Sequence, residues 1–308
     1  MPPPTNINVA VQLYSKRFIA RLQRRIALLK AFSTNLSDEF GNPGTTIDVP
    51  ILSADPAGAW DDATNNFSRS ATDVNTRPVT LDQRIITGFS ITMMHLAKFL
   101  PHWWEGKADL NVNAIAQAIV DPILGLITPE NYGYTADTNL VWNPATLTLD
   151  NIADLRSKLV DKGMVMERTA LCLSPTVYSK LLAKLDASIT GSDTAIRYGI
   201  LDRVLGFEQI IEVPGLTIPG FACHPDAILA GSKRMEVADT TPYKIFTSMV
   251  EPNTGMHLNS VVLTNGPTGQ TSYSVSAMFG CEVGEENSLV RLVTAMPTPP
   301  PPETPPAG

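Results

Sequence analysis

The residues of this chain that could do covalent or acid–base chemistry are few and scattered. Ser174 could act as a nucleophile, but the sequence around it supplies no recognisable base or oxyanion turn. No glycine-rich phosphate loop ends in Gly-Lys-Ser or Gly-Lys-Thr, since Gly106-Lys107 lacks the earlier glycine and is followed by alanine. The histidines show no His-Glu-x-x-His arrangement, and they are His95, His102, His224 and His257. The sequence therefore predicts no enzyme activity, no metal site and no cofactor.

The adjacent carboxylates and the cysteines likewise predict no catalytic or metal site. Asp61-Asp62 and Glu285-Glu286 diverge on a strand or loop, so neither pair forms a facing acid and base, and we expect solvated acidic surface. The three cysteines, Cys172, Cys223 and Cys281, are far apart in sequence, odd in number and each within a predicted strand. His224 would point to the opposite side of a strand from Cys223. We expect buried thiols rather than a disulfide or a zinc site.

The N-terminal segment is strongly basic. Residues 1–37 contain no Asp or Glu but carry Lys16, Arg17, Arg21, Arg24, Arg25 and Lys30, whereas the whole chain has a formal net charge of -7. Apolar residues at Phe18, Leu22, Ile26 and Leu29 continue a spacing that draws one stripe down a helix. One interpretation is a docked helix with a solvated basic face. The other is an arm whose cations meet a scaffold protein, packaged nucleic acid or an acidic neighbour.

The sequence around Ser174 gives the clearest prediction of secondary structure. Residues 169–173 predict a buried strand that feeds a helix, with Ser174 as the N-terminal cap and Pro175 at the first helical position. A turn at Gly206 and strands leading to Pro214 and through residues 220–228 follow. This order of strand, helix, turn, strand, strand resembles the axial domain of tailed-phage major capsid proteins, which share the Hong Kong 97-like fold.

A long hairpin precedes this segment. A turn at residues 41–44 and a strand at residues 45–52 are followed by a polar excursion, before Arg77-Pro-Val-Thr-Leu-Asp82 resumes an alternating strand. The layout resembles the extended loop that lies over the adjacent subunit in capsid proteins, which places Trp60, Asp61, Asp62, Phe67 and Arg69 as inter-subunit contacts. Residues 53–76 contain no lysine, so we expect a shell without covalent crosslinks.

The remaining patterns predict helices, strands and a tail. Apolar and small residues over 109–127 predict a helix of about five turns, which Pro122 should bend or shift, and residues 150–163 predict a shorter helix closed by Gly163. Residues 243–250, 258–264 and 270–283 predict strands. The consecutive prolines after residue 296 cannot join a sheet, and we expect a mobile end that the fold does not need.

The resemblance implies an α+β chain, and it divides the chain into successive parts. These are a basic arm (1–40), an extended-loop hairpin (41–84), a peripheral domain with the spine helix at 109–127 (85–147), an axial domain (148–240), returning strands of the peripheral domain (241–295) and a proline-rich tail (296–308).

The function that the resemblance implies is a major capsid protein that self-assembles from hexamers and pentamers into an icosahedral shell around a double-stranded DNA phage genome. It implies assembly in the host cytoplasm, residence in the virion, a separate scaffolding protein and portal, and nonspecific contact with DNA. The composition, 44% hydrophobic and 17% charged, is compatible with a subunit that hides surface against neighbours. The sequence shows no apolar run long enough to span a membrane and no secretion signal. Alternatives are an encapsulin-like nanocompartment shell, a hydrolase using Ser174 or Cys223, and a proline-tailed binding module.

Overall fold

The computed structural model describes residues 17–23, 25–51, 75–92, 101–184, 200–202, 205–235, 244–251, 254–265 and 270–300. The described part contains both helices and sheets, so the α+β prediction is confirmed. After a helical segment at residues 17–23, the helices are η1 Ala27–Ala31, α3 Pro101–Gly125, α4 Pro129–Tyr132, α5 Leu149–Asp161, η2 Met166–Arg168, α6 Pro175–Lys184, η3 Pro225–Ala227 and η4 Glu286–Ser288. The strands are β1 Ser33–Gly41, β2 Thr46–Ile51, β3 Asn75–Thr80, β4 Gln83–Thr92, β5 Asn139–Val141, β6 Ala170–Leu173, β7 Ile200–Asp202, β8 Gln209–Glu212, β9 Gly220–Cys223, β10 Ile228–Met235, β11 Lys244–Val250, β12 His257–Asn265, β13 Gln270–Val283 and β14 Leu289–Val293.

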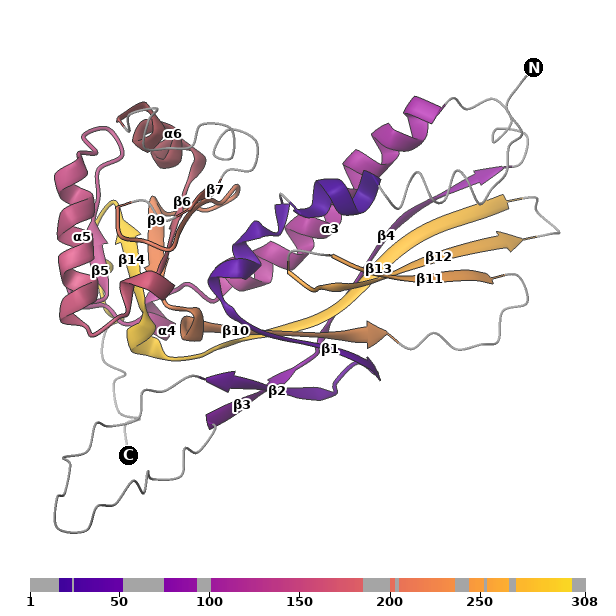
Figure 1. Ribbon diagram of the computed structural model, residues 1–308, viewed down its shortest axis with the longest axis horizontal. Helices are drawn as coiled ribbons and strands as arrows, with labels where there is room; N and C mark the ends of the chain where they lie inside the picture. The colour runs from indigo at the N-terminus through magenta and orange to yellow at the C-terminus, as the bar shows by residue number, and fades with distance from the viewer. Residues whose placement is uncertain are drawn as a thin grey trace, which may run out of the picture.

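The first sheet runs in the order β1-β10-β13-β12-β11, and β4 also pairs with β13. The long helix α3 lies along this sheet (Figure 1). Val112, Ile115 and Ile119 of α3 share one buried core with Val275 and Phe279 of β13. The amphipathic pattern of α3 therefore faces the sheet, as the apolar spacing predicts.

The second sheet runs in the order β5-β14-β9-β6-β8-β7 and forms a separate lobe with α5 and α6 (Figure 1). Every residue of β6, β9 and β14 is buried, because the sheet is covered on both faces. Leu171 and Leu173 pack into the core under α5 and α6, while Cys172 and Phe221 face the core shared with the N-terminal segment. Continuous apolar runs rather than alternation mark these strands for that reason.

A two-stranded antiparallel ribbon, β2 with β3, lies against the first sheet below its main body (Figure 1). The sequence predicts that these two strands pair, and the structure adds the register, which runs from Thr46 opposite Thr80 to Ile51 opposite Asn75. Alternate side chains on one face, including Val49 and Val79, are buried beside Leu229 of β10.

The helices begin and end for identifiable reasons. Thr148 caps α5 by accepting from the backbone N–H of Asn151, whose side chain accepts from the N–H of Thr148 in return. Gly163 follows α5 with a φ of 79°, a conformation that glycine adopts without cost. The helix α3 begins at Pro101, eight residues before the predicted start. It ends at Gly125, three residues after Pro122, and the next bonds run to residues three back, from Leu126 to Ile123.

The tertiary structure places several strands differently from the sequence-based division. The strand β1 was not predicted; it lies in the range assigned to the arm and pairs parallel with β10. The strand β10 falls in the range assigned to the axial domain but belongs to the first sheet, whereas β5 and β14 fall in the peripheral ranges but join the second. The apolar residues of a strand predict that it is buried, but they do not predict which strand it pairs with. That choice joins residues far apart in the sequence, such as Arg291 and Asn139.

Candidate functional site

The N-terminal helical segment is docked on the same chain. Phe18, Leu22 and Ile26 are fully buried and share the core of Val112 and Ile115 on α3. The apolar stripe predicted from the sequence therefore packs within the subunit. Of its described basic residues, Arg17 is partly exposed and Arg21 and Arg25 are exposed, and all three lie beside residues of α3.

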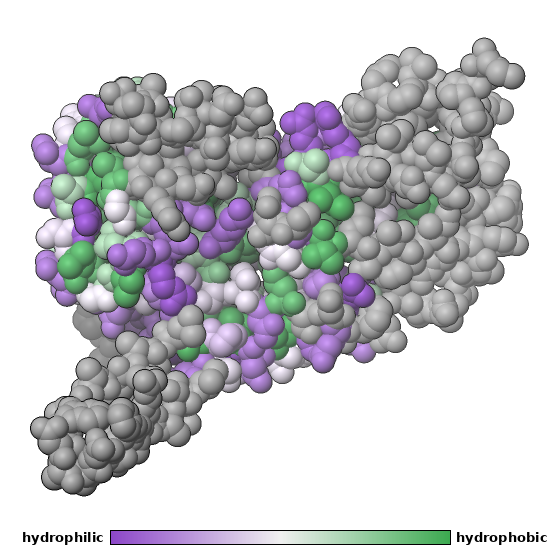
Figure 2. Space-filling view, viewed as in Figure 1, coloured by the Kyte–Doolittle hydropathy of each residue, from purple (hydrophilic) through white to green (hydrophobic). Residues whose placement is uncertain are grey.

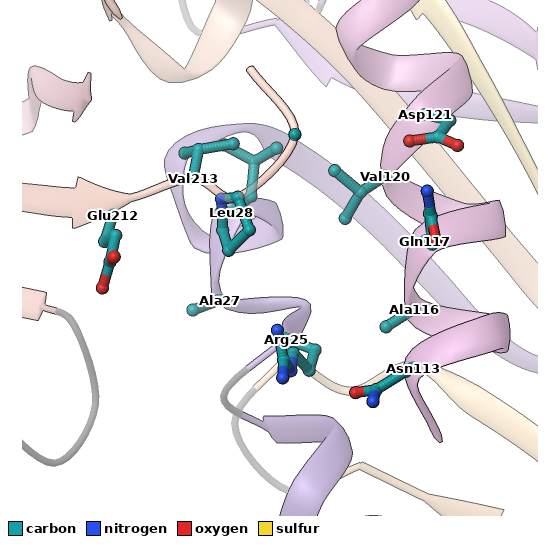
Figure 3. A pocket seen from close by; sticks show the side chains of 12 residues that line it. Arg25, Ala27, Leu28, Asn113, Ala116, Gln117, Val120, Asp121, Glu212 and Val213 are labelled. Carbon is teal, nitrogen blue, oxygen red and sulfur yellow. The ribbon is translucent and has the colours of Figure 1, made fainter. Parts of the chain in front are cut away.

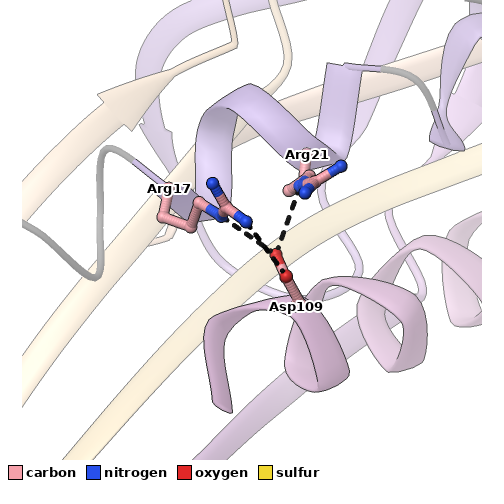
Figure 4. Close-up of polar contacts among 3 residues, drawn as sticks. All are labelled: Arg17, Arg21 and Asp109. Atoms are coloured by element: carbon pink, nitrogen blue, oxygen red, sulfur yellow. Dashed lines mark hydrogen bonds and ion pairs between the residues drawn. The ribbon is translucent and has the colours of Figure 1, made fainter. Parts of the chain in front are cut away.

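Two of the predicted arm cations meet one carboxylate. The Nε of Arg17 lies 3.3 Å and the Nε of Arg21 lies 3.4 Å from Oδ1 of Asp109 on α3 (Figure 4). The side chains are 37% to 44% exposed, so water screens the pairs. Because one negative charge meets two positive charges, the cluster stays net positive.

Of the other four arm cations, the structure describes two. Arg25 and Lys30 are exposed, and Arg25 lines a pocket instead. Lys16 and Arg24 lie outside the described residues. The extended-loop contacts predicted from the sequence, Trp60, Asp61, Asp62, Phe67 and Arg69, also lie outside them.

The pocket beside Arg25 has a volume of about 210 Å³ and lies between η1, α3 and the turn after β8 (Figure 3). Leu28, Val120 and Val213 give it an apolar floor. Asn113, Gln117 and Asp121 give it a polar edge, one helical turn apart on α3. No motif in the sequence predicts this pocket. Its only local signal is that polar stripe on a helix whose other face is apolar.

A second hollow lies where the ribbon meets the lobe carrying α5, with a volume of about 810 Å³. At its base, Asp226 is 3% exposed and lies 3.1 Å from Nδ1 of His224, and it accepts a 2.8 Å hydrogen bond from the hydroxyl of Ser33. Burial alone would raise the pKa of Asp226, but the hydrogen bonds from His224 and Ser33 hold that pKa below its ordinary value. The carboxylate is therefore a charged structural anchor.

Ser174 lies immediately before α6, where the sequence places a cap. Its N–H donates to Pro219 O at 3.0 Å, and its carbonyl accepts from the N–H of Tyr178 at 2.9 Å. The hydrogen bond expected from its side chain stays a prediction. His224 contacts Asp226, which in turn accepts from the hydroxyl of Ser33.

The cysteines are free thiols, with Cys172 and Cys223 buried on the adjacent strands β6 and β9 and Cys281 partly buried. Burial, with the neighbouring Cys223, raises the pKa of Cys172, so this thiol stays protonated and unreactive. Within the described ranges, no group of three or more His, Cys, Asp or Glu side chains gathers as a metal site. No described helix combines the length and apolar character needed to cross a bilayer.

Comparison with known proteins gives matches among solved structures alone. No family model matches the chain. No curated protein matches it. The capsid of the cyanophage P-SCSP1u is similar at 12% identity and a TM-score of 0.49, over 86% of this chain and 87% of that one.

Two further structures have the same degree of similarity. The mature capsid of bacteriophage PhiM1 is similar at 12% identity and a TM-score of 0.45, over 86% of each chain. A virus-like particle from Pyrococcus furiosus is similar at 12% identity and a TM-score of 0.48, over 90% of this chain and 96% of that one. Phage capsids are thus among the solved structures to which this chain is similar, as the resemblance in the sequence predicts.

Proposed function

We propose that this chain is the major capsid protein of a tailed phage and self-assembles into the icosahedral shell around a double-stranded DNA genome. The observation that carries the proposal is the ribbon β2–β3. Residues 75–78 are exposed on both sides although their backbone is paired, and Thr46, Asp48 and Pro50 are exposed along β2. One face of the ribbon packs on the first sheet, and its exposed face and its exposed end at residues 75–78 would gain by lying on a neighbour.

Repeated contacts of ordinary size would make such a shell durable. A standard protein interface buries on the order of 1,600 Å², and a subunit that both donates a ribbon and receives one makes at least two. Large hydrophobic side chains such as Ile86, Leu110, Val160 and Val165 remain exposed, and Figure 2 shows hydrophobic residues scattered among hydrophilic ones on the described surface. Burial of these side chains between subunits would add apolar contact area. Hexamers and pentamers of one chain would then close the shell.

The charge distribution fits an inward role for the arm. Residues 1–37 carry only basic charge, while the remaining residues carry all 30 Asp and Glu of the chain. Packaged DNA would be repelled by the acidic body and attracted by the arm, where Asp109 neutralises only part of the charge of Arg17 and Arg21. We further propose that a separate scaffolding protein and a portal direct assembly in the host cytoplasm, and that the protein acts structurally and not as an enzyme.

A nanocompartment shell is the second candidate, because such a shell needs a site for cargo and the structure contains a pocket that could serve as one. The pocket between η1, α3 and the turn after β8 has an apolar floor that a short apolar peptide would fit. Its small volume, about 210 Å³, admits only one or two side chains. The phage shell is therefore the preferred function.

The experiment is electron microscopy and sedimentation of the chain expressed alone and then together with the phage proteins encoded beside it. The proposal expects closed shells, or rings of five and six subunits. A monomer under both conditions contradicts it. The contents of shells separate the two candidates, since a phage shell fills with DNA in the presence of its packaging proteins and a nanocompartment retains one cargo protein.

A further inference from the structure

Two connections between the sheets are bonded to each other. The chain passes from β9 in the second sheet to β10 in the first through η3, and it returns from β13 to β14 through Gly284 and η4 (Figure 1). The backbone N–H of Gly284 donates to Ala227 O at 2.8 Å, and that of Glu285 donates to Asp226 O at 2.8 Å. We call these two connections, residues 224–227 and 284–288, the junction.

Side chains from other elements also hold the junction. Tyr132 of α4 donates its buried hydroxyl to Ala227 O at 2.7 Å, and Ser33 at the start of β1 donates to the carboxylate of Asp226 at 2.8 Å. The strands β10 and β13 lead directly into the junction. Any rotation of one sheet against the other must therefore displace it.

The ribbon is fixed to the first sheet by apolar contacts. Ile47 and Leu81 share a buried cluster with Met278 of β13, and Val79 shares another with Leu229 of β10. These contacts make the ribbon follow the first sheet. They do not by themselves relate the direction of the ribbon to the second sheet.

Arg77 of the ribbon supplies that relation, because it reaches the junction. Its Nη1 donates to Gly284 O at 2.8 Å, and its Nη2 lies 3.2 Å from Oε1 of Glu285. A planar guanidinium that bonds at two points fixes direction as well as distance, which an ammonium does not do. The side chains of Arg77 and Glu285 are both 48% exposed, so water screens the ion pair, and the bond to the carbonyl is the stronger of the two contacts.

We propose that Arg77 is a latch that ties the direction of the ribbon to the angle between the two sheets. With both bonds formed, the first sheet, the ribbon and the junction move as one body. With both bonds broken, the ribbon follows the first sheet alone. Rings of five and of six subunits place the next subunit at different angles, so the latch would make the direction of the ribbon differ between them. That last step rests on the proposed function, whereas the latch itself is a property of one subunit.

Distances between spin labels test the latch within one subunit. Labels at Pro50→Cys of β2 and Asp154→Cys of α5, both exposed positions, measure the separation of the ribbon from the second lobe. Labelled chain is diluted into unlabelled chain, and Cys281→Ser removes the native thiol that is only partly buried. Arg77→Gln should widen the distribution of distances about twofold or more.

Two further variants decide what the widening means. Arg84→Gln changes an exposed arginine of β4 outside the junction and should leave the distribution as in the parent. Arg77→Lys keeps the charge but not the planar fork, and should widen the distribution as Arg77→Gln does. A distribution for Arg77→Gln no wider than that for Arg84→Gln overturns the proposal. A narrow distribution for Arg77→Lys overturns the two-point latch, because charge alone would then hold the ribbon.

Particle diameters measured by electron microscopy test the latch in assembly. Arg77→Gln should broaden the distribution of diameters, and Arg84→Gln should not. Particles of Arg77→Gln that are as uniform as those of the parent overturn the role of the latch in assembly. If the parent chain forms no particles, the proposed function fails instead, and the spin-label distances still decide whether the latch exists.

Discussion

Asp226 joins parts of the chain that meet only in the folded state. Its carboxylate holds Ser33 at the start of β1 and His224 after β9, and its carbonyl accepts from the N–H of Glu285 at 2.8 Å. A buried carboxylate that keeps its charge through such bonds is more stable ionised when folded than when unfolded.

The pH dependence of stability follows from this anchor. The pKa of Asp226 is lowered from its ordinary 3.8, so its contribution is fully present above that value and is lost as the pH falls through the lower, folded-state pKa. Asp226→Asn should cost about 1–3 kcal/mol at neutral pH, and the cost should shrink below about pH 4. Denaturant unfolding from pH 7 to pH 3 measures it. The exposed Asp154→Asn on α5 is the control, and an equal effect of both changes would contradict the assignment.

The ion pairs of Asp109 with Arg17 and Arg21 should matter more for DNA binding than for stability. Asp109→Asn removes the partner of Arg17 and Arg21, but these exposed pairs should contribute no more than about 1 kcal/mol to the free energy of unfolding. The change also adds one unit of positive charge beside the arm, which should strengthen binding to DNA and make it more salt-dependent. Asp121→Asn lies on the same helix away from the cluster and provides the control for the added net charge in a DNA-binding titration. Equal gains from both changes would show that net charge alone is responsible.

Among the elements, β13 connects most of the first sheet, pairing with β4, β10 and β12 along its length. It passes very close to the ribbon at Gly280, where an added Cβ would lie 2.0 Å from the carbonyl oxygen of Thr80. Only glycine permits this approach, because backbone atoms and not a movable side chain fill the space.

Gly280→Ala therefore tests how the ribbon is seated. It should destabilise the fold by about 1–3 kcal/mol, since the strand and the ribbon must move apart. Gly106→Ala on α3 meets nothing within 4 Å and should instead stabilise by about 0.5–1 kcal/mol. Thermal unfolding of both variants gives the comparison, and a tolerated Gly280→Ala would mean that the ribbon is loosely held.

At the scale of the whole molecule, folding and assembly are separable. Among the described residues, the cores around α3 and around α5 with α6 are built entirely from parts of the chain other than residues 52–74, which lie outside the described ranges. Replacing residues 52–74 by Asn-Gly, which favours a two-residue hairpin turn, should leave the free energy of unfolding within about 1 kcal/mol of the parent. The same change should abolish shells, because the proposed contact with the next subunit is gone. Sedimentation measures both states, and normal shells from the shortened chain would remove the segment from the assembly mechanism.

The sequence predicted individual helices and strands better than it predicted which strands pair with one another. The pairing of β2 with β3, the strand β13 and the helix after Ser174 were predicted because each depends on short-range patterns of alternation, turns and caps. The early start of α3 and the strand β1 were missed. The first has aromatic residues that suit strand or helix, and the second is polar in much of its length.

The candidate sites also combine features that the sequence predicts with features that only the folded chain shows. The sequence by itself determined that the arm is basic, that the loop between β2 and β3 is acidic, and that the central strands of the second sheet are apolar, because charge and hydrophobicity are properties of the residues. Only the tertiary structure decided that Arg17 and Arg21 meet Asp109 and that the Nζ of Lys162 is buried with no hydrogen-bond partner among the described residues. Those positions depend on which distant segments pack together, and packing is selected by the burial of the whole core rather than by any local spacing.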